Sequence, residues 1–346
     1  MKLFLLNITL CLSFFFFAET GHANEEQIVP LRGINLAGGE FGGKVLPGVH
    51  GKNYIFPTRD DIKTYANFGF QIIRLPFKWE RLQPELNKPL DEEYLKYIDI
   101  VIDEAQKQNV KVILDVHNYG KYRKKLIGSE DVPTASFASF WSGLAAYYKD
   151  KPNVLFGLMN EPHKHNAKKW TNIAQEAITA IRTAGAAQTI LVPGTYYSAA
   201  YKWLKKDGEL SNAEALRHIH DPLDNFIFEA HFYFDRDSSG THADCVSDTI
   251  GVERLTSFTN WLRINKHKGL LGEFGVSRDP VCIEALDKTL AYMDKNSDVW
   301  FGWTYWAASA WFGDYMFNIY PPNASIFPQA RALKKYIDKK DQGEEK

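Results

Sequence analysis

One pattern of apolar and polar residues recurs along most of this chain. A short apolar run, such as residues 30–36, is followed by a longer stretch with apolar residues at helical spacing, such as 58–68. Thr58 and the acidic residues after it are typical of a helix start. In residues 91–109 the apolar side chains again fall on one helical face. The pattern predicts strands and helices that alternate.

Eight apolar runs are candidate strands. They lie at 30–36, 70–77, 110–119, 153–160, 189–194, 225–232, 269–274 and 299–306. Helical stretches lie at 58–68, 91–109, 134–148, 166–184, 251–266 and 281–294, with a weaker one at 211–218. The runs are mostly continuous rather than alternating, which indicates parallel strands covered on both faces. Eight such units predict a (β/α)8 TIM barrel of the α/β class, as a single domain.

A doubly wound open sheet is the alternative fold. It would usually carry a glycine-rich phosphate loop with the spacing G-x-G-x-x-G between an early strand and a helix. The stretch "GINLAGGEFGG" is rich in glycine, but it has a different spacing and no helix opens there. We therefore favour the barrel, with residues 24–340 as its domain and 341–346 as a charged tail.

The first 23 residues have the form of a secretory signal peptide. A lysine precedes an apolar run at 3–18, and Gly21-His22-Ala23 places small residues at −3 and −1 of a cleavage site after Ala23. A membrane anchor is the alternative, but the run is short for a span and Asn7 and Thr9 interrupt it. We expect a secreted or periplasmic protein.

The cysteines fit an exported protein. Removal of the signal removes Cys11 and leaves Cys245 and Cys282. An even pair outside the reducing cytosol suggests one disulfide, and two unrelated buried thiols are the alternative. The two cysteines follow the sixth and seventh runs, and neighbouring barrel strands would place those loops side by side.

The charge and composition of the chain limit the kinds of partner that we expect it to bind. The formal net charge of −1 gives no electrostatic reason to expect nucleic acid or an anionic membrane as a partner. Aromatic residues make up 14% of the chain, and a surplus of flat side chains suits a flat ligand such as a sugar ring. We expect a monomer that contacts neither nucleic acid nor, after signal removal, a membrane.

Polar residues gather where the apolar runs end, and the carboxyl ends of barrel strands are where catalytic residues collect. In chain order they are Arg74, His117, Asn118, Asn160, Glu161, His231, Tyr233, Glu273 and Trp306. Singly, each has an ordinary explanation, such as a helix cap, an ion pair or core packing. Together, Glu161 and Glu273 can face each other across the barrel mouth. Acetal hydrolysis requires such a pair, one carboxyl protonated and the other ionised.

The surrounding residues fit the same chemistry. Arg74 and the two histidines could supply a positive field, Asn160 an amide donor, and Trp306 a flat platform for a sugar. Further candidate platforms are Trp79, Tyr119, Trp203 and Trp311, each equally explained by core packing.

These motifs resemble a known family. "NEP" at 160–162, "HFY" at 231–233 and "GEFG" at 272–275 are similar to the signatures of glycoside hydrolase family 5. "LDVHNY", "LMNEPH" and "DSSGTHADCV" resemble its secreted endo-β-1,4-glucanase (cellulase) branch. The resemblance implies an enzyme that cleaves internal β-1,4 bonds of cellulose or related β-glucans, without metal or cofactor. Mannan, xyloglucan, mixed-linkage glucan and 1,3-glucan remain alternative substrates.

The resemblance also implies roles. Glu273 would attack the anomeric carbon, and Glu161 would act first as acid and then as base in a retaining double displacement. Tyr233 would orient Glu273 and Arg74 would keep it ionised. Asn160 would bind the sugar 2-hydroxyl, and His117 and His231 would line the subsite beside the broken bond. We see no cellulose-binding module, so soluble or amorphous glucan is the expected substrate.

Two other classes of protein are alternatives. A metal-dependent barrel hydrolase would want His-x-His on the first strand, which the run at 30–36 lacks. Residues 235–246 begin like a calcium loop, but Val246 stands where such a loop has glutamate. We therefore expect no metal site. A non-catalytic carbohydrate-binding barrel should have lost one of the two glutamates, and both are present.

Overall fold

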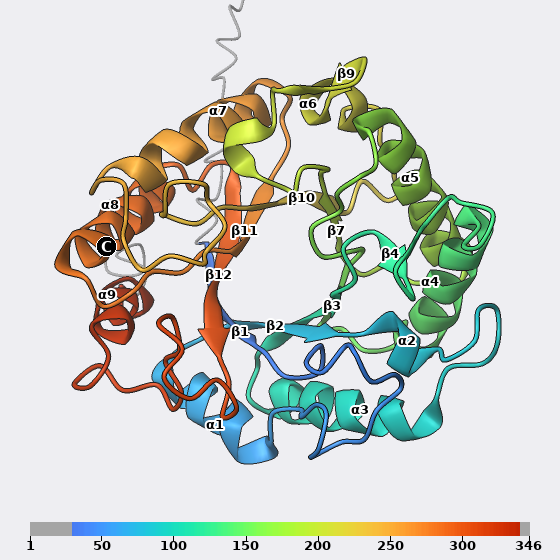
Figure 1. The fold of residues 1–346 in the computed structure, drawn as a ribbon, viewed down its shortest axis with the longest axis horizontal. Coiled ribbons are helices and arrows are strands. Elements are labelled where there is room, and N and C mark those ends of the chain that lie inside the picture. Colours follow the sequence, from blue (N-terminus) through green and yellow to red (C-terminus); the bar gives the residue numbers. More distant parts are fainter. Residues whose placement is uncertain (1–29, 340–346) are drawn as a thin grey trace, which may run out of the picture.

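The computed structural model describes residues 30–339, which form one closed barrel of eight parallel strands (Figure 1). The order around the barrel is β1-β12-β11-β10-β7-β6-β3-β2, and β2 pairs with β1 to close it. The strands are β1 (Leu31–Leu36), β2 (Ile72–Phe77), β3 (Lys111–Val116), β6 (Val154–Gly157), β7 (Ile190–Pro193), β10 (Phe226–His231), β11 (Gly269–Glu273) and β12 (Trp300–Ala308). The predicted (β/α)8 barrel is confirmed. The proposed signal peptide and charged tail lie outside the described residues.

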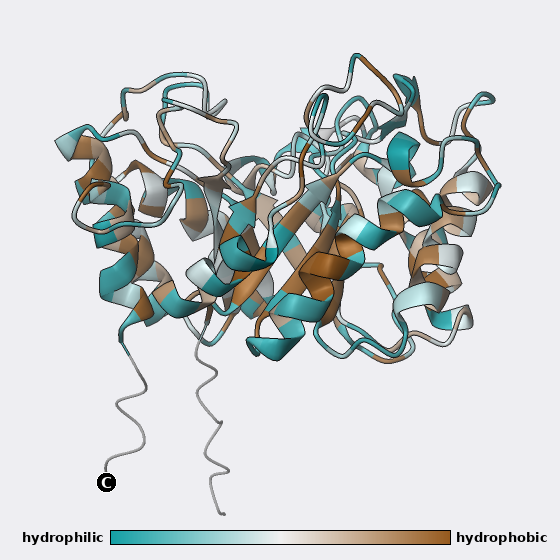
Figure 2. Cartoon of the chain, turned by 90° about the horizontal axis from the view of Figure 1, so that it is seen from below, coloured by the Kyte–Doolittle hydropathy of each residue, from teal (hydrophilic) through white to brown (hydrophobic). Residues whose placement is uncertain are grey.

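Helices surround the barrel and turn an apolar face toward it (Figures 1 and 2). They are α1 (Arg59–Phe68), α3 (Glu92–Lys107), α4 (Thr134–Tyr148), α5 (Ala167–Thr183), α6 (Asn212–Leu216), α7 (Ile250–Ile264), α8 (Pro280–Lys295) and α9 (Pro328–Ile337). Thr58 caps α1 in a capping box with Asp61, as the sequence indicated. The sequence analysis placed no helix after the eighth strand, where α9 begins at Pro328 and buries Leu333 and Tyr336.

Several further small elements were not predicted, among them the 3-10 helix η1 (Ala200–Lys202). The short helix α2 (Trp79–Leu82) follows β2. Two hairpins, β4 (Lys121–Tyr122) with β5 (Lys125–Leu126) and β8 (Lys206–Asp207) with β9 (Leu210–Ser211), lie in loops after barrel strands. Strands of two residues are too short to show an alternating pattern.

The barrel interior is built in layers. A separate apolar cluster forms one layer, with one side chain from each of six strands: Ile72, Ile113, Leu155, Leu191, Ile227 and Leu270. Side chains two residues further along a strand point to the same face. That rule places Arg74, Asp115 and Glu229 directly above this apolar layer, followed by His117 and His231. The inner faces of these strands therefore change from apolar to polar side chains toward the carboxyl end of the barrel.

The predicted disulfide is present between Cys245 and Cys282, whose Cα atoms lie 5.3 Å apart. Cys245 lies between β10 and α7, and Cys282 lies in the first turn of α8, which follows β11. The bridge thus ties together the loops that follow two neighbouring strands. No helix among residues 30–339 is long and apolar enough to cross a membrane.

Replacing both cysteines with alanine is expected to lower the free energy of unfolding by about 3–4 kcal/mol, because the bridge closes a loop with a sequence separation of 37. Turnover is expected to fall as well, since the bridge holds the segment after Tyr233 against the helix after Glu273. Denaturant unfolding and activity of the double variant measure both effects. An unchanged unfolding midpoint would contradict the stabilising role, and two free thiols in the denatured, unreduced protein would contradict the bridge itself.

Candidate active site

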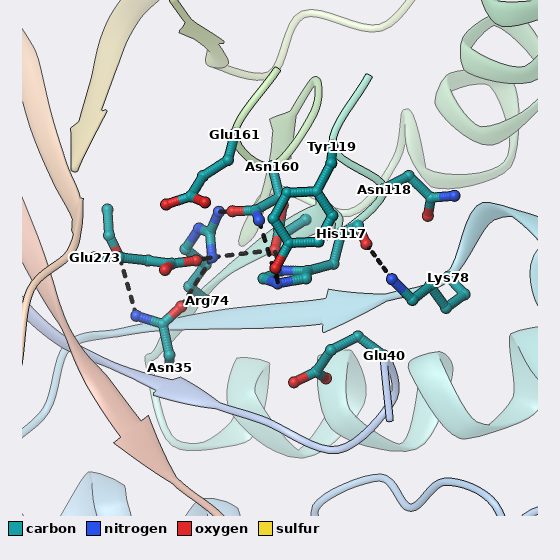
Figure 3. A network of polar contacts seen from close by, with 12 residues as sticks. Asn35, Glu40, Arg74, Lys78, His117, Asn118, Tyr119, Asn160, Glu161 and Glu273 are labelled. Atoms are coloured by element: carbon teal, nitrogen blue, oxygen red, sulfur yellow. Dashed lines mark hydrogen bonds and ion pairs between the residues drawn. The ribbon is translucent and has the colours of Figure 1, made fainter. Parts of the chain in front are cut away.

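A buried arginine organises the carboxyl end of the barrel. The Arg74 side chain is fully buried and carries three carboxylate neighbours, Asp115, Glu229 and Glu273, at 3.0, 2.8 and 2.8 Å. Its remaining contacts are to the side-chain oxygens of Asn35 and Asn160, at 3.0 and 2.8 Å. Figure 3 shows Arg74 between Asn35, Asn160 and Glu273. The carboxylates hold the pKa of Arg74 above its ordinary value despite burial, so a permanent positive charge lies beneath the site.

Glu273 ends β11 and is held at both carboxylate oxygens. Arg74 donates to Oε1 at 2.8 Å, and the Tyr233 hydroxyl donates to Oε2 at 2.9 Å. Burial raises the pKa of Glu273 above its ordinary value, and the charges of His231 and Arg74 oppose that rise. Both oxygens accept hydrogen bonds, and this geometry favours the ionised carboxylate. Burial, together with the negative charge of Glu273, raises the pKa of Tyr233 well above its ordinary value, so its hydroxyl remains a donor.

A glycine makes room for this arrangement. A Cβ atom on Gly272 would lie 2.1 Å from Oε1 of Glu229. Only glycine before Glu273 therefore allows the Glu229 carboxylate to reach Arg74 across the barrel interior. This explains the glycine in the "GEF" motif by close packing rather than by backbone conformation.

Glu161 lies beyond the end of β6, on a strained turn over the barrel mouth. Its φ of 43° is in the left-handed region, which costs a residue with a side chain roughly 1–2 kcal/mol. The backbone on either side is fixed. Before Glu161, Asn160 N donates to the Val116 carbonyl and Tyr119 N donates to the Asn160 carbonyl, and after it Tyr197 N donates to the Pro162 carbonyl. The turn aims the partly exposed Glu161 carboxylate toward Glu273 (Figure 3). Such strain is typical of functional positions.

The two glutamates are close together. One carboxylate oxygen of Glu161, one of Glu273 and a ring nitrogen of His231 all lie within 4.8 Å of one another. Retaining glycosidases hold their two carboxyl groups about 5–5.5 Å apart, whereas inverting enzymes need about 6.5–9.5 Å to admit a water. The spacing agrees with the expected retaining pair.

The two histidines carry different charges although each follows a carboxylate by two residues. Burial lowers the pKa of His117 to about 3, so its ring is neutral. Its Nδ1 lies 2.8 Å from Asp115, which makes Nδ1 the donor and leaves Nε2 to accept from the Asn160 amide at 3.1 Å. The amide of Asn160 is thereby fixed between Arg74 and His117.

His231 is charged. Burial alone would lower its pKa, but the carboxylates of Glu273, Glu161 and Glu229 outweigh burial and raise the pKa to about 10. Nδ1 donates to Glu161 at 3.0 Å, and Nε2 donates to Glu229 at 3.2 Å. The imidazolium therefore links the strained Glu161 to the buried charge layer.

A cavity of about 920 Å³ covers this pair of carboxylates. Seven predicted residues line it: His117, Tyr119, Glu161, His231, Tyr233, Glu273 and Trp306. Four tyrosines that the sequence analysis did not single out also line it: Tyr196, Tyr197, Tyr201 and Tyr315. The Trp306 ring stacks on His117 at 5.6 Å between centroids, which holds its face in the cavity. An aromatic-walled hollow above two acids suits a sugar polymer.

The four aromatic residues proposed as sugar platforms lie in three different kinds of place. Trp79 and Trp203 have no exposed surface, so the expectation that they stack on sugars is wrong. Trp79 packs on Tyr122 and Phe140, and Trp203 on Phe258, behind the loops rather than over the cleft. Tyr119 does line the cavity. Trp311 is 43% exposed but lines neither the cavity of about 920 Å³ over the two glutamates nor a second one of about 660 Å³.

Asn118 contacts a neighbouring loop and not the two glutamates. Its side-chain oxygen accepts from the Trp79 backbone at 2.9 Å, and its amide donates to Glu80 at 2.7 Å. Figure 3 shows it pointing away from the two catalytic candidates. Asn118 therefore braces the loop that carries α2 and does not reach the Glu161–Glu273 pair.

Glu229 and Asn35 belong to the site but were not predicted from the sequence. Glu229 bonds to Arg74 and His231, and Asn35 accepts from Arg74 while its amide donates to the Gly272 carbonyl at 2.9 Å. A detectable signal existed for Glu229: it is a carboxylate within an apolar run, two residues before His231 and so on the same strand face.

Two groups of side chains in residues 30–339 have atoms close enough to share a metal ion. One is Glu161, His231 and Glu273, in which the protonated His231 donates to Glu161 and would oppose a cation. The other is Asp235, Asp237 and His242, in the loop after β10. Asp235 already accepts from the backbone N–H groups of residues 240–242. Neither arrangement requires a metal to explain its geometry.

Comparison with known proteins identifies the family of this chain. The cellulase family, glycosyl hydrolase family 5, matches residues 23–309. Endo-beta-1,4-glucanase B of Aspergillus niger is 38% identical over 309 residues, which is 89% of this chain and 90% of the relative.

Solved structures are also similar. XacCel5A in complex with cellopentaose is 48% identical, with a TM-score of 0.87 over 89% of this chain and 99% of that chain. Endoglucanase Cel5A of Pseudomonas stutzeri in complex with cellobiose is 37% identical, with a TM-score of 0.82 over 89% and 92%. The strand-end glutamates, the shared fold and these matches lead to one assignment: this chain belongs to the cellulase family of glycoside hydrolases, glycosyl hydrolase family 5.

Proposed function

We propose that this protein is an endo-β-1,4-glucanase that hydrolyses internal bonds of cellulose chains or related soluble β-glucans with retention of configuration. The observation that carries the proposal is the close approach of the Glu161 and Glu273 carboxylates under an aromatic-walled cavity. The names of the relatives support the choice of polymer, since the Aspergillus niger protein is an endo-beta-1,4-glucanase.

In the first step, a carboxylate oxygen of Glu273 attacks the anomeric carbon while the bond to the leaving sugar breaks. Arg74 and Tyr233 hold the Glu273 carboxylate in place through both oxygens. Glu161 gives its proton to the leaving glycosidic oxygen, which departs as a hydroxyl. The result is a glycosyl ester on Glu273 and a carboxylate on Glu161.

In the second step, Glu161 takes a proton from water and the resulting nucleophile attacks the same carbon. The ester bond breaks, Glu273 regains its negative charge and Glu161 regains its proton. His231 remains charged below its pKa of about 10 and faces both carboxylates, so it stabilises whichever is ionised. The Asn160 amide, fixed by Arg74 and His117, is the proposed donor for the sugar 2-hydroxyl.

Export is part of the proposal. Residues 1–23 have the composition of a cleavable signal, and the Cys245–Cys282 bridge is a covalent link expected of an oxidising compartment. We propose that the mature protein, which begins after Ala23, acts as a monomer outside the cytosol on a β-glucan.

A substrate panel tests the function. We expect reducing sugars from hydroxyethyl cellulose and carboxymethyl cellulose, with less from mannan and xylan, and a fall in viscosity that precedes most of the sugar release because cleavage is internal. Greater turnover of mannan or xylan than of either cellulose derivative would favour the alternative polymers. Tight binding without sugar release from any polymer would indicate a carbohydrate-binding barrel instead.

A further inference from the structure

A second cavity, of about 660 Å³, adjoins the catalytic one. The two share Tyr119 and Tyr197 in their linings. His163 lies between these tyrosines, 5.9 Å from the Tyr119 ring and stacked at 4.4 Å on Tyr197. The Tyr119 hydroxyl lies 3.2 Å from Nε2 of His117 in the catalytic cavity. The two hollows are therefore parts of one cleft, divided by an aromatic wall.

The second cavity is lined by positive charge. Its cations are Lys44, Lys78, Lys121, Arg123 and Lys124, none of which forms an ion pair within residues 30–339. We call these five residues the basic cluster. Burial and then the nearby charge of Lys164 lower the pKa of Lys121, as expected where cations crowd together.

The carboxylates near the basic cluster offset only part of its charge. Glu80 lines the cavity and offsets at most one of the five positive charges, and its two oxygens accept from the Asn118 amide and the Arg123 backbone N–H. Glu40 lies near Lys78, and burial raises its pKa to about 7, so much of it is neutral at neutral pH. Because the whole chain has a formal charge of only −1, this local excess of positive charge is not a general property of the surface.

The hairpin β4–β5 gives independent evidence. Arg123 and Lys124 form its two-residue turn and have φ values of 45° and 68°. Such turns favour glycine or asparagine at both positions, since other side chains are strained there. The chain instead places a cation at each position, and both residues line the cavity. A local rule broken in this way indicates that the charges serve a function.

We propose that the basic cluster binds carboxylate groups carried by the glycan, so that the enzyme favours acidic β-glucans, such as chains bearing uronic acids, over neutral ones. This inference rests on the proposed endoglucanase function. The hydroxyl groups of a neutral glucan need hydrogen-bond partners but no excess of cations. A substituent that passes the wall of Tyr119 and Tyr197 would meet the basic cluster while the backbone occupies the catalytic cavity.

The turn offers a test that spares the fold. In the variant Arg123→Asn/Lys124→Gly both charges are removed and the turn receives its preferred residues, so thermal stability should be kept or raised. Lys266→Asn is the matched control for Lys124→Asn, because Lys266 is also exposed with a positive φ of 58°. Lys266 lies between α7 and β11, at the opposite end of the barrel from the cleft.

The measurement is KM and kcat on two polymers with the same backbone, carboxymethyl cellulose and neutral hydroxyethyl cellulose. We expect the double variant to raise KM for carboxymethyl cellulose by about two- to tenfold, with kcat and the KM for hydroxyethyl cellulose unchanged. Lys124→Asn should give part of this effect and Lys266→Asn none. Raising the salt from 0.15 M to 1 M shortens the screening length from about 8 Å to about 3 Å and should remove the difference.

Two results would overturn the inference while leaving the proposed function intact. One is an unchanged KM for carboxymethyl cellulose in the double variant, and the other is an equal rise for both polymers. Failure of the unaltered enzyme to hydrolyse hydroxyethyl cellulose would instead overturn the proposed function, and this inference with it.

Discussion

Glu273→Ala is expected to reduce turnover of cellulose oligomers on the order of 10⁴-fold or more, the scale seen when other hydrolases lose their nucleophile. The carboxylate that Arg74 and Tyr233 hold in place would be missing, so no glycosyl ester can form. Added azide should restore turnover on an activated aryl glycoside, because a small anion fits the vacated space. The azide would attack the anomeric carbon directly in one displacement, so its product should have inverted configuration.

The fold should survive this substitution. Arg74 keeps its ion pairs with Glu229 and Asp115, so the charge layer loses one partner only. Glu284→Ala is a suitable control, because Glu284 is an exposed glutamate on α8 of the same chain. Circular dichroism and kinetics of both variants separate folding from catalysis. Full activity in Glu273→Ala would end the two-carboxylate mechanism.

The barrel could be predicted from the sequence because its strands are buried on both faces. Their continuous apolar runs stand out from the helical stretches, and each predicted run contains one barrel strand, although β1 starts one residue later than 30 and β12 ends two residues after 306. The two hairpins could not be found, since their register depends on turn geometry and on contacts with distant loops. The short α9 likewise depends on packing of Leu333 and Tyr336 against the rest of the barrel.

The candidate site was predictable where topology alone fixes position. A polar residue at the carboxyl end of a barrel strand must lie at the rim, and this rule found Glu161 and Glu273. Arg74 was expected at a strand end as well, but β2 continues to Phe77, so Arg74 lies inside the barrel below the rim. The direction of a loop side chain follows no such rule. Trp79 and Trp203 point into the core because their rings fill space against neighbouring helices and loops, which the order of residues does not reveal.

Glu229 belongs to the site although it was not predicted from the sequence. A charged residue inside an apolar run looks like an exception to be ignored, yet Arg74 and His231 compensate its burial. Alternation along the strand would have linked Glu229 to His231 and Asp115 to His117. A charged residue that lies two positions before a histidine at the end of a barrel strand therefore indicates a residue of the same site.

Glu161→Gln is expected to slow hydrolysis of cellulose oligomers by about 10²–10⁴-fold, because the departing sugar oxygen then receives no proton. The substitution is conservative, since the amide oxygen can still accept from Nδ1 of His231, which lies 3.0 Å from the native carboxylate. An aryl glycoside with a strongly activated leaving group needs little protonation, so its first step should be nearly as fast as in the unaltered enzyme.

The second step distinguishes a catalytic Glu161 from a structural one. Glutamine cannot take a proton from water, so the glycosyl ester on Glu273 should accumulate with the activated substrate. Stopped-flow measurement should show a burst of released phenol followed by slow turnover. Azide needs no base and should speed the slow phase, giving a product of retained configuration because two displacements have occurred. Equal losses on cellulose oligomers and activated aryl glycosides, without a burst, would mean that Glu161 only supports the structure.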